Sequence, residues 1–262
     1  MRIRHGPCNA RSCNIPKMRW LTLTTRPMSL ALRLLRSLER AALPNVCVFC
    51  GARCRLKAAP ICTPCYADLP WIDRACPRCA KPVVAELSED ISCAACQQDP
   101  PPFTAAVAAL GYSFPIDAAI KAMKFRRKLC YVPAFVHALM MAAEKLPAGI
   151  DALLPVPLHW RRQALRGFNQ AAELCRPLCR QTGLEQINNV VRRRPTPYQS
   201  GLAARLRRGN LRSAFSVQGP VAARHVLIVD DVITTGETCR ELAQVLRDAG
   251  VEKVSVLAVA RA

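Results

Sequence analysis

Two adjacent carboxylates, Asp230 and Asp231, follow a run of four bulky aliphatic residues at positions 226–229. Such a run is typical of a central strand that is buried on both faces of a parallel sheet. Open α/β sheets bind their ligands at the carboxyl ends of such strands. Neighbouring carboxylates suit the vicinal hydroxyls of a sugar or a hydrated Mg²⁺ ion. The pair is therefore predicted to form the centre of a ligand site.

A turn rich in Thr and Gly follows the acids at residues 234–238, and apolar residues then recur at helical spacing up to Gly250. The free N–H groups and the positive dipole end of a helix N-terminus favour an anion, and a monophosphate fits this turn. A Walker A loop is excluded because its Gly-Lys-Ser/Thr end is absent. The arrangement resembles the phosphoribosyl pyrophosphate (PRPP) signature of type I phosphoribosyltransferases. In that signature two acids hold the ribose 2′- and 3′-hydroxyls and the turn holds the 5′-phosphate.

Cysteine pairs with two intervening residues occur four times in the first hundred residues. Each pair can present two thiolates to one ion, and four thiolates complete a tetrahedral zinc site. Two structural zinc ions are therefore predicted, with sequential pairing as the default and a nested arrangement left open. A redox dithiol would explain one pair but not four. The predicted ligands are Cys47, Cys50, Cys62, Cys65, Cys76, Cys79, Cys93 and Cys96.

Two further features of this region concern single residues. Gly51, after the first pair, suits the left-handed turn of a zinc knuckle, whereas Ala80 stands where a second such glycine is expected. Cys54 belongs to no pair.

Charge is the most unusual property of the composition. The 262 residues carry a formal net charge of +20, with thirty arginines against eight lysines. Arginine matches phosphate oxygens in a bidentate manner, so the excess favours a polyanionic partner such as nucleic acid. A GC-rich genome that encodes Arg in place of Lys is the alternative explanation.

The sequence has no apolar run of the roughly 18 residues that a membrane span needs, and it lacks a secretory leader. A cytoplasmic location without a membrane span is expected. In such a reducing compartment the fifteen cysteines favour metal binding over disulfides.

The chain divides into three predicted parts. Residues 1–28 indicate a disordered tail or a wrongly assigned gene start. Residues 29–98 contain an amphipathic helix at 29–42 and the zinc module, and a polar, proline-rich joint at 97–102 ends them. Residues 103–262 indicate an α/β domain with a parallel sheet.

Within the last part, the patterns predict a strand at 103–114, helices at 116–123 and 131–146, and a short buried strand at 151–157. The end of this second strand should lie on the same rim as Asp230. A further helix should open at 167–170. Residues 192–215, rich in arginine, are expected to form a mobile functional loop, with a solvated charged surface as the alternative.

Three side chains outside the main motifs are not expected to take part in catalysis or metal binding. Cys175 and Cys179 lie one helical turn apart and are expected to be small buried apolar residues, not a metal or redox pair. His159, beside Trp160 in a basic segment, is expected to contact phosphate or the surface and not to act as a base.

Taken together, the motifs from about Val46 to the C-terminus resemble the ComF family. The resemblance implies a double zinc ribbon followed by a type I phosphoribosyltransferase-like domain. Members are linked to natural competence and to cytoplasmic handling of imported single-stranded DNA, and some are described as amidophosphoribosyltransferase-like. Besides the cysteine pairs and the acids, the resemblance is carried by Lys124, Phe125, Pro155, Val156, Pro157, Arg166, Gly167, Phe168, Asn169, Gln170, Thr196, Gln199, Leu202, Arg207, Asn210 and Phe215.

The resemblance also implies a PRPP site with Mg²⁺. Asp230 and Asp231 would hold the ribose and, through water, the metal, and the turn after Pro155 would face the pyrophosphate. Chemistry of this kind relies on positioning and electrostatic stabilisation, so a clear catalytic His or Cys is not required. The implied PRPP-binding residues are Lys124, Pro155, Val156, Pro157, Arg166, Arg207, Asp230, Asp231, Thr234, Thr235, Gly236, Glu237 and Thr238.

Two functions remain open from the sequence. The first is a phosphoribosyltransferase that acts on an unidentified base, amine or nucleic acid. The second is a non-catalytic protein that binds single-stranded nucleic acid and cooperates with DNA-uptake proteins. It would use the PRPP pocket as a ligand sensor or as a site for a 5′-phosphate.

Overall fold

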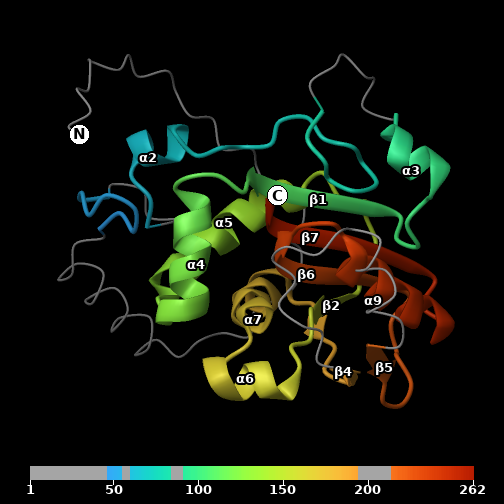
Figure 1. Ribbon diagram of the computed structural model, residues 1–262. Helices are drawn as coiled ribbons and strands as arrows, with labels where there is room; N and C mark the ends of the chain where they lie inside the picture. The colour runs from blue at the N-terminus through green and yellow to red at the C-terminus, as the bar shows by residue number, and fades with distance from the viewer. Residues whose placement is uncertain (1–45, 55–59, 84–90, 194–213) are drawn as a thin grey trace.

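The computed structural model describes residues 46–54, 60–83, 91–193 and 214–262 (Figure 1). Its centre is a five-stranded sheet in the order β1-β7-β6-β2-β3, and every neighbouring pair of strands is parallel. Parallel neighbours need long crossover connections, which explains the helices between strands. The strands are β1 (Ala105–Gly111), β2 (Ala152–Pro155), β3 (Glu185–Gln186), β6 (His225–Ile233) and β7 (Lys253–Arg261).

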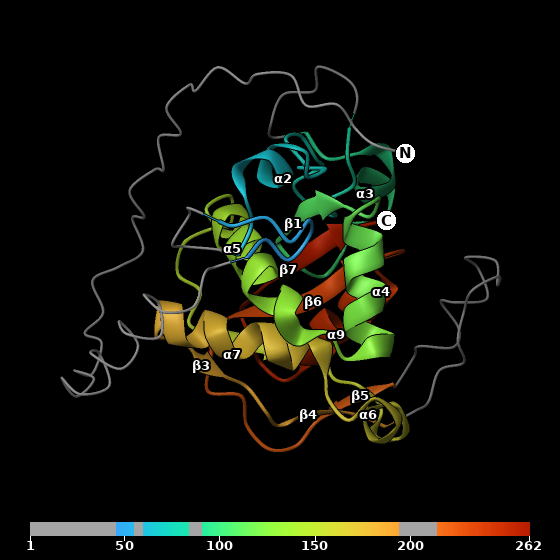
Figure 2. The same ribbon diagram turned by 90° about the vertical axis from the view of Figure 1, so that its left-hand side faces the viewer.

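Helices cover both faces of this sheet (Figure 2). Leu227 and Val229 of β6 pack into a core with the helices of one face, and Val226 and Ile228 pack against the opposite helix. Alternating side chains of one strand thus supply both cores, as the aliphatic run predicts. One face carries α4 (Ile116–Arg126), α5 (Val132–Ala143) and α7 (Gln170–Thr182), and the other carries α9 (Glu237–Asp248). Within the ranges described, no helix combines the length and apolar character that crossing a membrane requires.

The cysteine-rich module packs along the outer strand β1. Gly111 N donates to Pro70 O at 2.7 Å and Ala106 N donates to Pro77 O at 2.9 Å. Cys62 and Leu69 are part of the core that lies beneath α4 and α5. The module therefore covers a sheet edge that would otherwise expose unpaired backbone groups. Its two short helices are α2 (Thr63–Ala67) and α3 (Ala94–Gln98).

Most predicted elements are confirmed with shifted ends. The strand predicted at 103–114 is the shorter β1, and the helix predicted at 116–123 continues to Arg126. The helix predicted at 131–146 consists of a 3₁₀ turn (Leu129–Tyr131) followed by α5. The expected helix after 167–170 is α7, because the Asn169 side chain accepts a hydrogen bond from Ala171 N at 3.0 Å and caps it.

Several elements have no counterpart among the predicted ones. Besides the strands β3 and β7 and the short helices α2 and α3, they are the helix α6 (Trp160–Arg166) and an antiparallel pair formed by β4 (Val190–Arg192) and β5 (Phe215–Val217). This pair joins the two ends of the predicted functional loop, whose residues 194–213 lie outside the described ranges. The amphipathic helix predicted at 29–42 and the tail predicted at 1–28 also lie outside them.

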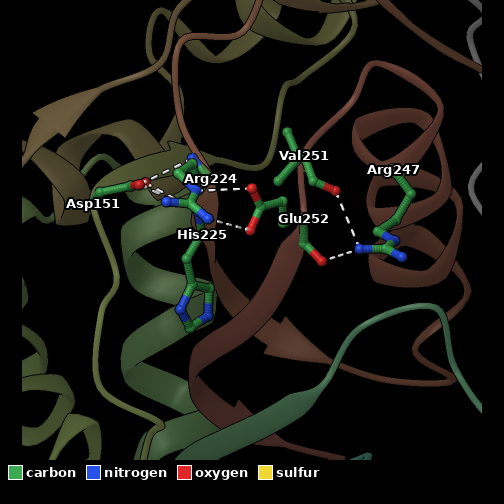
Figure 3. Close-up of polar contacts among 6 residues, drawn as sticks. All are labelled: Asp151, Arg224, His225, Arg247, Val251 and Glu252. Carbon is green, nitrogen blue, oxygen red and sulfur yellow. Dashed lines mark hydrogen bonds and ion pairs between the residues drawn. The ribbon is translucent and has the colours of Figure 1, made fainter.

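The amino end of the sheet is fixed by a polar cluster (Figure 3). The Asp151 carboxylate accepts from Arg224 N at 2.9 Å and from His225 N at 3.2 Å, which aligns β2 with the start of β6. The Arg224 guanidinium donates to both carboxylate oxygens of Glu252 at 2.8 and 3.0 Å. Arg247 of α9 donates to the Glu252 carbonyl. These contacts fix the register of the strands at the end opposite to the acid pair.

We predict that Asp151→Ala lowers the free energy of unfolding by about 1–3 kcal/mol, because two backbone N–H groups lose a charged acceptor. Chemical denaturation of the purified protein measures this. Glu252→Ala is the matched control, since it breaks only an exposed ion pair and should change stability little. Equal losses in the two variants would contradict the proposed role of Asp151.

Candidate functional site

The sequence predicts the acid pair at the point where the strand leaves the sheet, but the pair lies inside the last part of β6. Asp230 pairs with Ala258 of β7, and the strand continues through Val232 and Ile233 because β7 runs beside it to the same point. Neighbouring strand residues point to opposite faces of a sheet. Asp231 accordingly faces α4. Asp230 faces the side of α9, where burial, and next the proximity of Asp230, raise the pKa of the Cys239 thiol.

Lys124 neutralises one member of the pair. Its Nζ atom lies 2.9 Å from Asp231 Oδ2, and Asp231 is only 6% exposed. Burial alone would lower the pKa of Lys124, but the neighbouring Asp231 raises it above its usual value. Burial, and next the repulsion from Asp231, raise the pKa of Asp230. The anionic form of Asp230 is thus disfavoured until a cation or a hydrogen-bond donor approaches it.

The turn after β6 leads directly into α9. Gly236 adopts a left-handed conformation with φ of 82° and is the N-cap of the helix, a geometry that side chains other than glycine disfavour. Thr235 Oγ1 accepts from Glu237 N at 3.5 Å, and both Thr234 and Thr235 are exposed. The amides that follow Glu237 in the first turn of the helix lack internal acceptors, which suits an anion. The predicted phosphate-binding residues in this turn are Thr234, Thr235, Gly236, Glu237 and Thr238.

The end of β2 lies beside the end of β6, as the sequence predicts. Val156 N donates to Val229 O at 2.9 Å, which continues the parallel pairing to the residue just before the acids. Val156 is buried, and its carbonyl accepts from the Asn169 side chain at 3.0 Å. Pro155 and Pro157 flank it, so the chain turns away at the same rim as the acid pair.

A basic cavity of about 520 Å³ opens next to Lys124. Arg166 also lines it, and its guanidinium donates to Gln170 Oε1 at 3.1 Å and lies 5.6 Å from the centre of the Phe125 ring. The structure therefore brings Lys124 and Arg166 to one cavity. Arg207 falls outside the described residues.

Helix α6 supplies much of this cavity and is missing from the sequence-based prediction. His159 is its N-cap, because Nδ1 accepts from Arg161 N at 3.3 Å, and it is only 3% exposed. The expectation that His159 lies at the surface is therefore wrong. Gly167, with φ of 83°, ends the helix. A glycine at this place is the feature of the sequence that could have indicated the end of a helix.

The eight predicted metal ligands form two clusters with sequential pairing. In each cluster the four sulfur atoms lie within 4.8 Å of one another. The Sγ atoms of Cys50 and Cys62 are 3.5 Å apart, and those of Cys79 and Cys93 are 3.7 Å apart. A tetrahedral site with Zn–S bonds of about 2.3 Å requires separations of roughly 3.8 Å. The clusters, Cys47/Cys50/Cys62/Cys65 and Cys76/Cys79/Cys93/Cys96, therefore suit one zinc ion each.

Backbone geometry favours a thiolate in each cluster. Burial would raise the pKa of Cys47, but hydrogen bonds from the backbone N–H groups of Cys62, Cys50 and Phe49 lower it to about 6. Burial would likewise raise the pKa of Cys76, but hydrogen bonds from backbone N–H groups lower it to about 7. The helix cysteine Cys175 is buried, as predicted, and burial raises the pKa of its thiol.

Both knuckles use a left-handed residue. Gly51 has φ of 76°, as predicted, and Ala80 adopts φ of 58° in the equivalent place after the third pair. Ala80 N donates to Cys76 O at 2.9 Å, so the turn forms although alanine disfavours this conformation.

Arg261 links the second cysteine cluster to the phosphate-type turn, a connection that the sequence does not reveal. Its Nε donates to Cys79 O at 3.2 Å and its Nη1 donates to Ile233 O at 3.1 Å. Nη1 also contacts Thr234 O. The cluster and the turn share the wall of a cavity of about 210 Å³. The zinc module therefore supports the ligand site from the α9 side of the sheet.

Known proteins match both halves of the chain. A double zinc ribbon domain matches residues 38–97 and a phosphoribosyl transferase domain matches residues 182–262. DNA utilization protein YhgH of Escherichia coli O157:H7 is 35% identical over 83% of this chain and 97% of its own length. Competence protein F of Haemophilus influenzae is 33% identical over 81% of this chain and 89% of its own. The chain belongs to the ComF/YhgH family.

The predicted fold class is thereby confirmed. The ComF/YhgH chain combines a parallel α/β sheet of the phosphoribosyltransferase type with a preceding zinc-ribbon module. A solved structure of the allosteric regulatory enzyme of purine biosynthesis overlaps 48% of this chain and 25% of its own, at 23% identity and a TM-score of 0.32. That overlap is too small to support any inference.

We predict that the purified protein holds two zinc ions per chain and releases them on acidification. Burial, and next the neighbouring thiols, raise the pKa of Cys65 and Cys96, so protons compete with the metal and its affinity falls as the pH falls. Elemental analysis after dialysis against a chelator at pH 8 and pH 5.5 measures this. Cys62→Ser should lose one zinc, whereas Cys54→Ser, outside both clusters, should keep two. Less than one zinc per chain in the parent would contradict the assignment.

Proposed function

We propose that this ComF/YhgH protein binds PRPP, or a related phosphorylated ribose, together with Mg²⁺ at the end of β6. One observation carries the proposal: a carboxylate pair in the last part of a central parallel strand is followed, two residues later, by the turn that begins α9. Vicinal hydroxyls and a phosphate on one ribose match these two neighbouring features.

The residues would divide the ligand among them. Asp230 and Asp231 accept hydrogen bonds from the ribose hydroxyls, and the turn at 234–238 donates backbone N–H groups to the 5′-phosphate. The turn formed by Pro155, Val156 and Pro157 faces the pyrophosphate. Arg166, Arg207 and Lys124 are proposed to neutralise that pyrophosphate. Lys124 lies 2.9 Å from Asp231.

The donor set fits a hard cation. Carboxylate and hydroxyl oxygens are the ligands that Mg²⁺ prefers. Burial, and next the neighbouring Asp231, raise the pKa of Asp230, so a cation bound beside it would favour its anionic form. When bound, Mg²⁺ neutralises the charge that develops on the departing pyrophosphate. Asp230 would hold the ribose hydroxyls in place, and the α9 turn would hold the 5′-phosphate while the acceptor approaches C1′. Transfer of a phosphoribosyl group to an unidentified acceptor is the reaction that this arrangement supports.

We further propose a cytoplasmic role connected with DNA. The relatives bear the names DNA utilization protein and competence protein F. The net charge of +20 favours a polyanionic partner. A second candidate function is accordingly the binding of single-stranded nucleic acid, in cooperation with DNA-uptake proteins and with the pocket serving as a sensor or a 5′-phosphate site.

The first prediction from this proposal concerns the acids. Asp230→Asn and Asp231→Asn each delete a charged acceptor worth roughly 1.5–3 kcal/mol, so affinity for Mg·PRPP should fall by roughly ten- to a hundredfold. Isothermal titration calorimetry on zinc-loaded protein measures it. Gly236→Val should also abolish binding, because valine disfavours the left-handed φ of 82° at the phosphate turn.

Zinc content serves as the control for these variants and should remain at two per chain. If both Asn variants bind Mg·PRPP as the parent does, or if the parent does not bind it, the transferase proposal fails. The nucleic-acid function would then take its place.

The second prediction concerns DNA. Single-stranded DNA should bind with little sequence preference and with strong salt dependence, because each neutralised phosphate releases counterions. Four to six contacts would give a slope of log affinity against log salt of roughly −3 to −4. Fluorescence anisotropy at salt concentrations from about 50 to 200 mM measures the slope. No binding at low salt would remove the nucleic-acid function.

A further inference from the structure

The basic cavity beside Lys124 combines cations with an exposed aromatic ring. It lies between the end of α4 and α6 and is lined by Lys124, Phe125, Arg127, Arg162, Leu165 and Arg166. Phe125 is 59% exposed and Leu165 is 82% exposed. Large apolar side chains that are exposed to solvent indicate a binding site when they gather in one place. The volume of about 520 Å³ lies within the usual range for small-ligand pockets.

Aromatic rings of this surface lie next to guanidinium groups. Arg166 lies 5.6 Å from the centre of the Phe125 ring, and Arg161 lies 5.2 Å from that of Trp160. Trp160 is 65% exposed. Planar rings and guanidinium planes stack on nucleobases irrespective of sequence, because every base has a π-face. The geometry therefore suits a planar ligand that carries negative charge.

The charge around the cavity exceeds what one phosphate requires. The segments 124–128 and 160–166 contain seven cationic side chains and no acidic one. Lys124 forms an ion pair with Asp231, and the remaining positive charge of the two segments makes the rim of the cavity attractive to anionic groups. The seven cationic residues are Lys124, Arg126, Arg127, Lys128, Arg161, Arg162 and Arg166.

We propose that this cavity binds a nucleobase together with its flanking phosphates. The base stacks on Phe125, the phosphates contact Arg127 and Arg162, and the opening toward Lys124 directs the bound unit to the acid pair. The cavity's role as the acceptor side of the transfer rests on the proposed transferase function, and its binding of a strand would give the second candidate function a defined site. The nucleotide unit can come from a free mononucleotide or from a single-stranded nucleic acid.

The test compares two matched phenylalanines. Phe125→Leu removes the stacking ring and keeps an apolar side chain, and Phe114→Leu makes the same change at a residue that is 82% exposed and does not line the cavity. Binding of a dye-labelled oligo-dT of about twelve nucleotides, a length that one binding groove covers, is followed by anisotropy without Mg²⁺ or PRPP. Phe125→Leu should weaken binding about fivefold or more, as loss of one stacking contact implies. Phe114→Leu should not.

The phosphate contacts are tested with a second pair. Arg162→Gln should weaken oligonucleotide binding and reduce its salt dependence, whereas Arg180→Gln, on the exposed surface of α7, should leave both unchanged. Thermal unfolding midpoints equal to that of the parent show that the variants are folded.

Three comparisons decide the outcome. The proposal is overturned if Phe125→Leu and Phe114→Leu bind the oligonucleotide equally, because the cavity would then bind anions without a base. Competition by dTMP identifies the source: equal affinity for dTMP and the oligonucleotide supports a free nucleotide, and tighter binding of the longer ligand supports a strand. Asp230→Asn should keep oligonucleotide binding while losing Mg·PRPP binding, so failure of either proposal is recognised separately.

Discussion

Two neighbouring carboxylates inside a central strand require compensation, and this requirement governs the arrangement of the site. Asp231 is buried and obtains its cation from Lys124 at the end of α4. Asp230 lies on the other face, where burial and repulsion from Asp231 raise its pKa. The parallel pairing of β6 with β2 and β7 holds both side chains in place. A ligand that brings hydroxyl donors and a divalent cation would favour the anionic form of Asp230.

The zinc module contributes to the same site, although it lies in another part of the sequence. It covers the outer strand β1, and its residue Cys62 packs into the core beneath α4. Arg261 joins Cys79 O to the carbonyls just after the acid pair. Metal binding and folding are coupled in small zinc modules, so loss of metal is expected to disturb the packing of this module against the domain that carries the acids.

The sequence predicts the strands and ligands that depend on local patterns. The aliphatic run before Asp230, the four cysteine pairs and the cap at Asn169 are signals of this kind, and the structure confirms them. Helix α6 escapes prediction because its N-cap is a histidine, a weak capping residue. The continuation of β6 past the acids depends on its neighbour β7, and the contact of Arg261 with Cys79 joins residues far apart in the sequence. Such tertiary pairings leave no local pattern.

A crystal structure of the protein with bound Mg²⁺ and PRPP tests the central claim most directly. The account predicts that the 5′-phosphate lies against the backbone N–H groups of the turn at 234–238. It also predicts that the ribose hydroxyls lie within hydrogen-bonding distance of Asp230 and Asp231. A ligand bound elsewhere, with the Lys124–Asp231 ion pair and the turn unchanged and free of ligand, would contradict the account.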